Sequence, residues 1–255
     1  MKISLITVCF NSVETIHSAI ESVLSQTYEN IEYIIVDGKS TDGTVDLIAN
    51  YKLRITENFP NIDFKFISEK DNGLYDAMNK GIRMATGDVI GIINSDDLFC
   101  DNDAMNKISS IFKLNENIDA VYANLYYVDK NDVSKIVRKW ICGTQAAFKK
   151  GWHPAHPTLY VRKNVYDKYG LFDLSFNLAA DFEIMLRFFE RYKISAYYLS
   201  DFLIKMRLGG TTNKNIKNIY KQNIECIRAF KQNNLKVNKV LYPIYRLLPK
   251  LLQYK

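Results

Sequence analysis

Short apolar runs and helical patterns alternate along the first hundred residues. Four apolar runs are predicted to be strands, at residues 3–8, 31–36, 62–67 and 89–93. Between them, apolar side chains recur every three or four positions, as on the buried side of a helix. Three helices are therefore predicted, over residues 13–24, 45–51 and 74–85. Asn11 and Glu14 are spaced like a capping box at the start of the first helix.

This alternation predicts an α/β fold with a mainly parallel sheet. Strands that are apolar throughout fit a sheet covered by helices on both faces. In such sheets, ligands bind beyond the carboxyl ends of the strands. Polar residues stand at these predicted ends, namely Asp37, residues 69–71, and the pair Asp96 and Asp97. We therefore expect a binding site at this edge of the sheet.

The pattern is looser after Asp97. A helix is predicted over residues 102–114, and strands over residues 120–128 and 133–140 would make the sheet mixed. A further helix begins near Asp181. The chain shows no internal repeat and no low-complexity linker, so we expect the first 210 residues or so to form one domain.

The 255 residues include 47% hydrophobic side chains and carry a formal net charge of +6. Such a chain can bury a sizeable core. Much of the positive charge lies between Lys205 and Lys255, and we expect no nucleic-acid partner. The four cysteines lack CxxC spacing, which argues against a zinc knuckle or a disulfide framework and favours a reducing, cytoplasmic compartment. No window approaches the roughly 18 apolar residues of a membrane span.

Three familiar motifs are incomplete. The segment Gly38-Lys39-Ser40 lacks the earlier glycine of a phosphate-binding loop, because Tyr33 stands at that position. The turn after the first predicted strand has no glycine-rich dinucleotide fingerprint, so a dehydrogenase is not expected. His153 and His156 have no neighbouring Cys or third His, which argues against a zinc site.

Asp96 and Asp97 directly follow a predicted strand, which would hold both carboxylates at the edge of the sheet. Adjacent carboxylates repel each other unless a cation or hydrogen-bond donors lie nearby. Mg²⁺ and Mn²⁺ prefer oxygen ligands and accept one or two carboxylates, with phosphates and water as the others. The alternative interpretation is a solvated Asp pair in a turn.

Other candidate residues also have structural alternatives. Asp37 could accept a hydrogen bond from a base or a ribose, or it could cap the turn after its strand. Thr7 and Phe10, at the end of the first predicted strand, could contact the same base. Asp181 opens an amphipathic helix, and its position alone favours an N-cap over a catalytic role.

Several blocks of sequence resemble the family 2 glycosyltransferases of the GT-A fold. The blocks of the first hundred residues, in the family's order, are SLITVCFN (4–11), YIIVDGKSTDGT (33–44), SEKDNGLYDAMNKG (68–81) and NSDD (94–97). The later blocks, which resemble the acceptor half of the family, are HPT (156–158), GLFD (170–173) and AADFE (179–183). The resemblance covers residues 1 to about 210.

The resemblance implies a GT-A glycosyltransferase domain at residues 1–211, with a nucleotide-binding half at 1–98 and an acceptor half at 99–211. It implies inverting transfer of a sugar from a nucleotide-diphosphate sugar to a hydroxyl of a glycan or polyprenyl-linked acceptor. The implied cofactor is a divalent cation, Mn²⁺ or Mg²⁺. The implied process is the synthesis of surface polysaccharide.

The resemblance also implies roles for single residues. Asp97, in the last place of a D-x-D-like motif whose first Asp is replaced by Ser95, would bind the metal. Asp181 would be the general base. The nucleoside would contact Thr7, Phe10, Asn11, Asp37, Asp71 and Asp96. Weaker candidates for the acceptor or the diphosphate are His156, Arg162, Glu183 and Arg207. A loop at residues 209–211 would close over the donor.

Residues 212–255 are predicted to form a basic, amphipathic helical tail. Apolar residues alternate with Lys and Arg in its last part, a composition that fits a membrane interface. Pro243 and Pro249 are expected to interrupt any single long helix. Packing on the catalytic domain or on a partner subunit is an equal alternative. Peripheral association with the inner face of the plasma membrane is therefore a hypothesis.

Three other functions are open on the sequence alone. A nucleotidyltransferase would need a similar metal and nucleotide site, but it usually has a glycine-rich basic loop near the first strand. A glycosidase would use two carboxylates without a nucleotide or a metal. A non-catalytic nucleotide-sugar-binding or assembly protein of the same fold would bind the donor without transferring its sugar.

Overall fold

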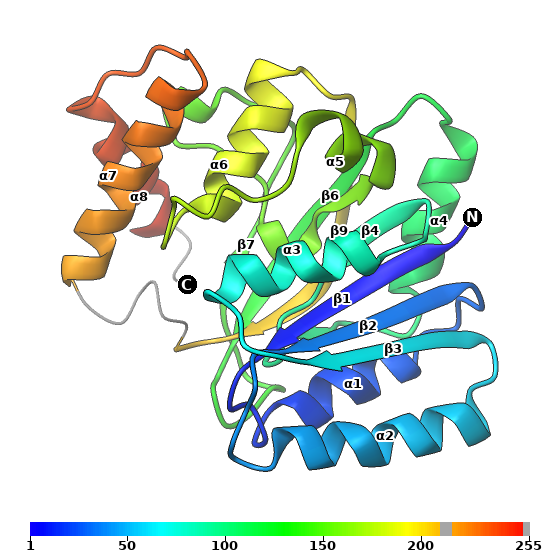
Figure 1. Ribbon diagram of the computed structural model, residues 1–255. Helices are drawn as coiled ribbons and strands as arrows, with labels where there is room; N and C mark the ends of the chain where they lie inside the picture. Colours follow the sequence, from blue (N-terminus) through cyan, green and yellow to red (C-terminus); the bar gives the residue numbers. More distant parts are fainter. Residues whose placement is uncertain (210–215, 252–255) are drawn as a thin grey trace.

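The computed structural model describes residues 1–209 and 216–251 (Figure 1). Four parallel strands make one side of the sheet, and they are β1 (Ile3–Cys9), β2 (Ile31–Asp37), β3 (Ile62–Ser68) and β4 (Val89–Ile92). Every residue of β1, β2 and β4 is buried, whereas β3 at the sheet edge is half-buried. The continuous apolar runs are thus explained by cover on both faces.

Three helices supply that cover: α1 (Ile16–Leu24), α2 (Thr44–Asn58) and α3 (Leu74–Met84). Figure 1 shows α3 on one side of the parallel strands and α1 and α2 on the other. A Cβ atom on Gly81 of α3 would lie 2.4 Å from Cγ2 of Ile6, so glycine allows this helix to pack closely against β1.

The second half of the chain completes the sheet with β5 (Leu98–Phe99), β6 (Ala120–Val128), β7 (Ile136–Trp140), β8 (Tyr160–Arg162) and β9 (Ala196–Arg207). Within the described residues the sheet has nine strands, in the order β3-β2-β1-β4-β8-β6-β9-β5, with β7 paired to β6. β8 is antiparallel to both β4 and β6, and β9 is parallel to β6. The α/β class and the predicted mixed sheet are confirmed.

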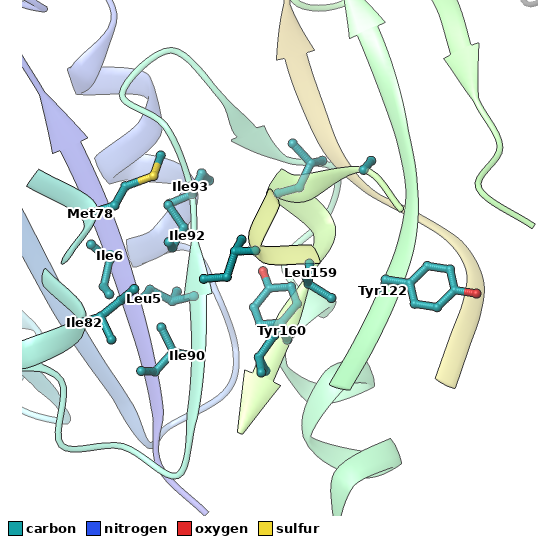
Figure 2. Close-up of a cluster of buried hydrophobic side chains, with 14 of the residues drawn as sticks. Leu5, Ile6, Met78, Ile82, Ile90, Ile92, Ile93, Tyr122, Leu159 and Tyr160 are labelled. Atoms are coloured by element: carbon teal, nitrogen blue, oxygen red, sulfur yellow. The ribbon is translucent and has the colours of Figure 1, made fainter. Parts of the chain in front are cut away.

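One core joins the two halves across the β4–β8 pair. Figure 2 shows Leu159 and Tyr160 between the isoleucines of β4, such as Ile90, and Tyr122 of β6. A Cβ atom on Gly91 would lie 2.3 Å from Cε1 of Tyr160, so the tyrosine ring occupies the space that a side chain at position 91 would need. The two halves of the sheet therefore share one hydrophobic core.

The remaining helices cover the second half. They are α4 (Ala104–Leu114), α5 (Lys163–Tyr169), α6 (Ala180–Leu186) with a π-helical continuation η3 (Arg187–Arg191), α7 (Ile216–Gln232) and α8 (Leu241–Leu251). The ring of Phe182 in α6 lies 5.8 Å from that of Phe230 in α7 and 6.1 Å from that of Tyr242 in α8. The tail thus packs on the domain at α6.

Most predicted elements of the first half are confirmed, since each of its four strands matches within one residue at either end. The capping box is wrong: α1 starts after Thr15, and the Oδ1 atom of Asn11 instead accepts a hydrogen bond from the Thr41 N–H at 2.9 Å. Strands β8 and β9 were not predicted. Pro243 and Pro249 both lie inside α8, which continues through them as one helix. Pro243 is in the first turn, where a backbone N–H has no acceptor within the helix, so the N–H that proline lacks is not missed there.

Candidate active site

The carboxyl ends of β1 to β4 meet at one edge of the sheet, as parallel pairing requires. β9 runs in the same direction and ends there at Arg207. Because β8 runs the opposite way, the 3-10 turn before it, η2 (His156–Thr158), lies at the same edge. A hydrogen bond of 3.0 Å between the hydroxyls of Ser12 and Ser95 joins the loops after β1 and β4. Segments from both halves therefore share one edge.

An exposed aromatic ring and a carboxylate converge beside β2. Phe10 is 63% exposed. A Cβ atom on Gly38 would lie 2.5 Å from Oδ2 of Asp71 and 3.4 Å from Cδ2 of Phe10, so both side chains meet over this glycine. The ring can stack on a planar base, and the carboxylate can accept a hydrogen bond from an N–H group. The arrangement suits a nucleobase.

Asp37 and Asn11 shape the loop that carries Gly38. The fully buried carboxylate of Asp37 accepts hydrogen bonds from the Ser40 N–H at 3.0 Å and from the Ser68 hydroxyl at 2.6 Å. Asn11 adopts a left-handed backbone with φ of 49° and accepts from the Thr41 N–H. Both side chains stabilise the loop through these hydrogen bonds. Their main role is therefore structural, and direct contact with a ligand would be an additional one.

Thr7 contributes to the core rather than to the edge. Its fully buried hydroxyl lies 3.1 Å from the hydroxyl of Tyr33, which is also fully buried. Burial raises the pKa of Tyr33, so its hydroxyl stays protonated and available for this bond. The structure does not bring the side chain of Thr7 to the site.

Asp97 is fully buried, yet one of its carboxylate oxygens has no partner among the described residues. Oδ2 accepts a hydrogen bond from Nδ2 of Asn94 at 2.8 Å, whereas Oδ1 has none. Burial and the charge of Asp96 raise the pKa of Asp97 well above its ordinary value, and burial also raises that of Asp96. A buried carboxylate oxygen without a partner is costly. A divalent cation would supply the missing positive charge, so this pair fits a metal.

Arg207 places a fixed cation beside the same pair. Its Nη1 donates to the backbone oxygen of Asp96 at 3.0 Å, and its Nη2 donates to Oγ of Ser18 at 3.1 Å. Its charge opposes the rise in the pKa of Asp97. Across residues 1–209 and 216–251, no group of three or more His, Cys, Asp or Glu is placed to hold a metal. The protein would therefore supply few ligands, as is usual for Mg²⁺ sites completed by phosphates and water.

Asp181 lies in the first turn of α6, but it is not the N-cap, because Ala179 occupies that position. This corrects the interpretation that its position alone favoured. Its Oδ1 accepts hydrogen bonds from the Phe182 N–H at 2.8 Å and from the hydroxyl of Tyr75 at 3.3 Å. Tyr75 is in the first turn of α3, so Asp181 is tied to the helix that follows the Asp71 loop.

Tyr75 and His156 frame this carboxylate. The ring of Tyr75 stacks on Phe172 with centroids 5.6 Å apart, and His156 meets the same Phe172 edge-on at 5.6 Å. Burial and the charge of Asp181 raise the pKa of Tyr75, so its hydroxyl remains a donor at any physiological pH. Burial lowers the pKa of His156, and Asp181 opposes that change. The carboxylate thus faces a permanent donor and a neutral imidazole.

The structure places two of the weaker candidates away from this edge of the sheet. Arg162 pairs with Val89 at the amino end of β4, on the edge opposite the site, and its guanidinium donates to the backbone oxygens of Ile118, Phe112 and Glu116. It therefore holds the end of α4 and cannot reach the donor or the acceptor.

Glu183 also points away from the site. Its carboxylate accepts two hydrogen bonds of 3.0 Å from Arg187 and one of 3.0 Å from Nδ2 of Asn233 in the segment after α7. It therefore fastens the tail to α6. Two positions further along a helix turn a side chain by more than half a revolution, which separates Glu183 from Asp181.

Tyr75 lies in one of the blocks that resemble the family, at residues 68–81, but the sequence alone indicates no role for it. The signal was weak, because its partner Asp181 lies 106 residues away in sequence. Of the loop expected at residues 209–211, only Gly209 is within the described part of the chain.

Comparison with known proteins identifies the fold and the class. Residues 4–188 match the model of glycosyl transferase family 2. The chain is 36% identical over 134 residues to UDP-Glc:alpha-D-GlcNAc-diphosphoundecaprenol beta-1,3-glucosyltransferase WfaP of Escherichia coli, which covers 51% of this chain and 48% of that relative.

Two solved structures resemble the whole chain. S. aureus TarS 1–349 in complex with UDP has a TM-score of 0.66 at 16% identity, covering 96% of this chain and 70% of TarS. The mannosyltransferase PcManGT from Pyrobaculum calidifontis, in complex with GDP-Man and Mn²⁺, has a TM-score of 0.64 at 16% identity, covering 98% of this chain and 69% of PcManGT. These likenesses establish the GT-A fold.

Proposed function

The chain belongs to glycosyl transferase family 2, and we propose that it is an inverting, metal-dependent enzyme acting on a glycan or lipid-linked glycan. Its class is that of glycosyltransferases with nucleotide-sugar donors. One observation carries the proposal: an exposed aromatic ring beside a carboxylate, an acidic pair and a separate carboxylate lie along one edge of one sheet.

The donor would occupy the first half, at residues 1–98. Phe10 and Asp71 would hold the base over Gly38, where added side-chain atoms would collide with Asp71. Asp96, at the end of the loop after β4, would accept from a ribose hydroxyl. Arg207 would face the diphosphate, since its guanidinium already lies against the backbone of Asp96.

Asp97 would hold the divalent cation, because its buried Oδ1 has an acceptor lone pair that no described group uses. When bound, Mn²⁺ or Mg²⁺ would neutralise charge that develops on the departing diphosphate. The replacement of the first Asp of the motif by Ser95 leaves Asp97 as the main protein ligand. The Mn²⁺ in the PcManGT complex is consistent with this assignment.

The acceptor would enter the second half, at residues 99–211. Asp181 would remove the proton from the attacking hydroxyl, and Tyr75 would keep one of its oxygens in place through their hydrogen bond. The attacking oxygen forms its bond to the anomeric carbon as the bond to the diphosphate breaks. Attack from the face opposite the diphosphate inverts the configuration of that carbon.

The acceptor class follows from chemistry shared with a relative. The name of WfaP specifies a diphosphoundecaprenol-linked sugar as acceptor. For this chain we propose a comparable lipid-linked glycan in surface-polysaccharide synthesis, used at the cytoplasmic face of the membrane. No helix among the described residues is long and apolar enough to span a bilayer. We propose that contact with the membrane is peripheral.

The proposal can be tested by incubating the protein with UDP- and GDP-sugars, a glycan-lipid acceptor and Mn²⁺, and measuring release of the nucleoside diphosphate. Asp181→Asn should lower transfer by about 10²–10⁴-fold, because general-base catalysis contributes that much. It should leave donor binding unchanged. Asp167→Asn, which alters an exposed carboxylate on α5, is the matched control.

The same assay distinguishes the alternatives. A nucleotidyltransferase would release pyrophosphate, and a non-catalytic protein would bind donor without releasing product. Near-normal turnover by Asp181→Asn would contradict the assignment of the base.

A further inference from the structure

Helix α8 packs on the domain through one aromatic and one basic side chain, Tyr242 and Arg246. Tyr242 is fully buried against Phe182 and Phe230, with its ring centroid 5.2 Å from that of Phe230. Arg246, one turn later, is also buried and donates to Oδ1 of Asn223 in α7 at 3.1 Å. These two side chains, four positions apart, fix which side of α8 turns inward.

The opposite side of α8 is apolar and open. Large hydrophobic side chains at the start of the helix and along its outer side are exposed: Val240, Leu241, Ile244, Tyr245 and Leu247. Val240 is 75% exposed and Ile244 53%. An ordinary surface helix buries its apolar stripe. α8 instead leaves most of its large apolar side chains exposed, so its outer side is suited to an apolar partner.

The positive charge of the chain is concentrated in the same segment. Residues 216–255 contain nine Lys or Arg and one Glu, whereas the other 215 residues carry a net charge of −2. Five lysines are exposed on α7 and the connection to α8, at positions 217, 221, 231, 236 and 239. Lysine is depleted at protein–protein interfaces, whereas lysine beside exposed apolar residues is typical of helices that lie on anionic bilayers.

We propose that the outer side of α8 and these lysines form a docking surface for an anionic lipid bilayer. α7 packs directly on α6, whose first turn carries Asp181. Figure 1 shows α7 and α8 at the end of the molecule toward which the arrowheads of β1 to β3 point. Docking would thus hold the acceptor side near the membrane surface. The functional reason for this surface rests on the proposed use of a lipid-linked acceptor. Binding to the bilayer itself does not require that the acceptor is lipid-linked.

Sedimentation of the full chain with vesicles tests the proposal without a donor or an acceptor. The wild type should bind equimolar phosphatidylcholine–phosphatidylglycerol vesicles, bind pure phosphatidylcholine much less, and be released by salt. The double variant Ile244→Glu/Leu247→Glu should bind about tenfold less, because two exposed apolar contacts are lost. Leu53→Glu/Leu114→Glu, which alters exposed leucines on α2 and α4, should bind like the wild type.

A second variant guards against misfolding. Lys236→Glu/Lys239→Glu changes only exposed charges and should weaken binding to anionic vesicles by about tenfold. Equal binding by the wild type and both α8-region variants would overturn the proposal. It would also fail if the wild type ignored vesicles and instead formed a dimer that Ile244→Glu/Leu247→Glu dissociates. Nucleoside diphosphate release with a water-soluble acceptor should persist in every variant, so loss of bilayer binding is distinguishable from loss of transfer.

Discussion

The two halves of the domain build their parts of the site in different ways. In the first half, parallel strands end at the site edge, and the residues just after each strand are the candidates: Phe10, Asp71 and the Asp96–Asp97 pair. In the second half, the candidates sit on a 3-10 turn, on the first turn of α6 and at the end of a strand that crosses most of the domain. The candidates for the base and the metal are therefore encoded locally, whereas Arg207 and the acceptor candidates reach the site through tertiary packing.

Among changes confined to the donor half, the largest effect is expected at Asp97. Asp97→Asn should lower transfer by about 10²–10³-fold, because charge on the leaving diphosphate would lose its compensation. Unlike Asp181→Asn, it should also weaken Mn²⁺-dependent binding of the nucleoside diphosphate, measured by calorimetry. Asp103→Asn, a nearby exposed carboxylate, is the control. If both catalytic variants impaired donor binding equally, the division between the halves would be wrong.

A buried ionic network stabilises the first half. The carboxylate of Glu32 is fully buried and accepts from Lys65, Ser4 and Thr86. Burial raises its pKa, but these hydrogen bonds outweigh that and lower it to about 2 from the model-peptide value of 4.5. Glu32→Gln should therefore cost about 3 kcal/mol of unfolding free energy at pH 7.

The pH dependence of this effect has a definite sign. Because the folded pKa is lowered, the stabilisation is fully present above about pH 4.5 and is lost as the pH falls toward 2. Urea denaturation at several pH values should show the wild type approaching Glu32→Gln in acid. Glu57→Gln, at an exposed position in α2, should match the wild type throughout. A constant difference between wild type and Glu32→Gln would contradict the assignment.

The smallest expected effect concerns the hydrogen bond between Tyr75 in the first half and Asp181 in the second. Tyr75→Phe removes the hydroxyl that donates to Asp181, and transfer should fall by about tenfold, the equivalent of one hydrogen bond to a charged group. Because the pKa of Tyr75 is raised, the ratio of wild-type to variant rates should stay constant between about pH 6 and 9. Tyr220→Phe, at an exposed tyrosine of α7, is the control. An unchanged rate would show that Asp181 needs no such support.

The same contrast explains how much could be predicted from the sequence. β1 to β4 are buried on both faces, so each appears as a continuous apolar run and could be recognised without the structure. β8 has only three residues, and β9 is half-buried or exposed except at the adjacent Leu203 and Ile204, so neither gives a strong periodic signal. Without the direction of β8, nothing showed that Arg162 lies on the far edge of the sheet.

The site shows the same limit. Asp96 and Asp97 are neighbours in sequence, so their shared place at the edge of the sheet was predictable from their position after a strand. The bond between Tyr75 and Asp181 spans 106 residues, and no local pattern reports it. Asp37 was interpretable either as a ligand contact or as a turn cap, and the bonds from Ser40 and Ser68 show the turn role directly.

The tyrosine ring that lies where position 91 would place a side chain has a consequence for recombination. Enzymes of this class are attractive material for exchanging acceptor modules between donors of different specificity. Here a crossover placed between β4 and β8 would separate Gly91 from Tyr160, and any bulkier residue at 91 would meet the ring at 2.3 Å. These two positions must be inherited as a pair, so a viable hybrid has to place its junction where that pair stays together.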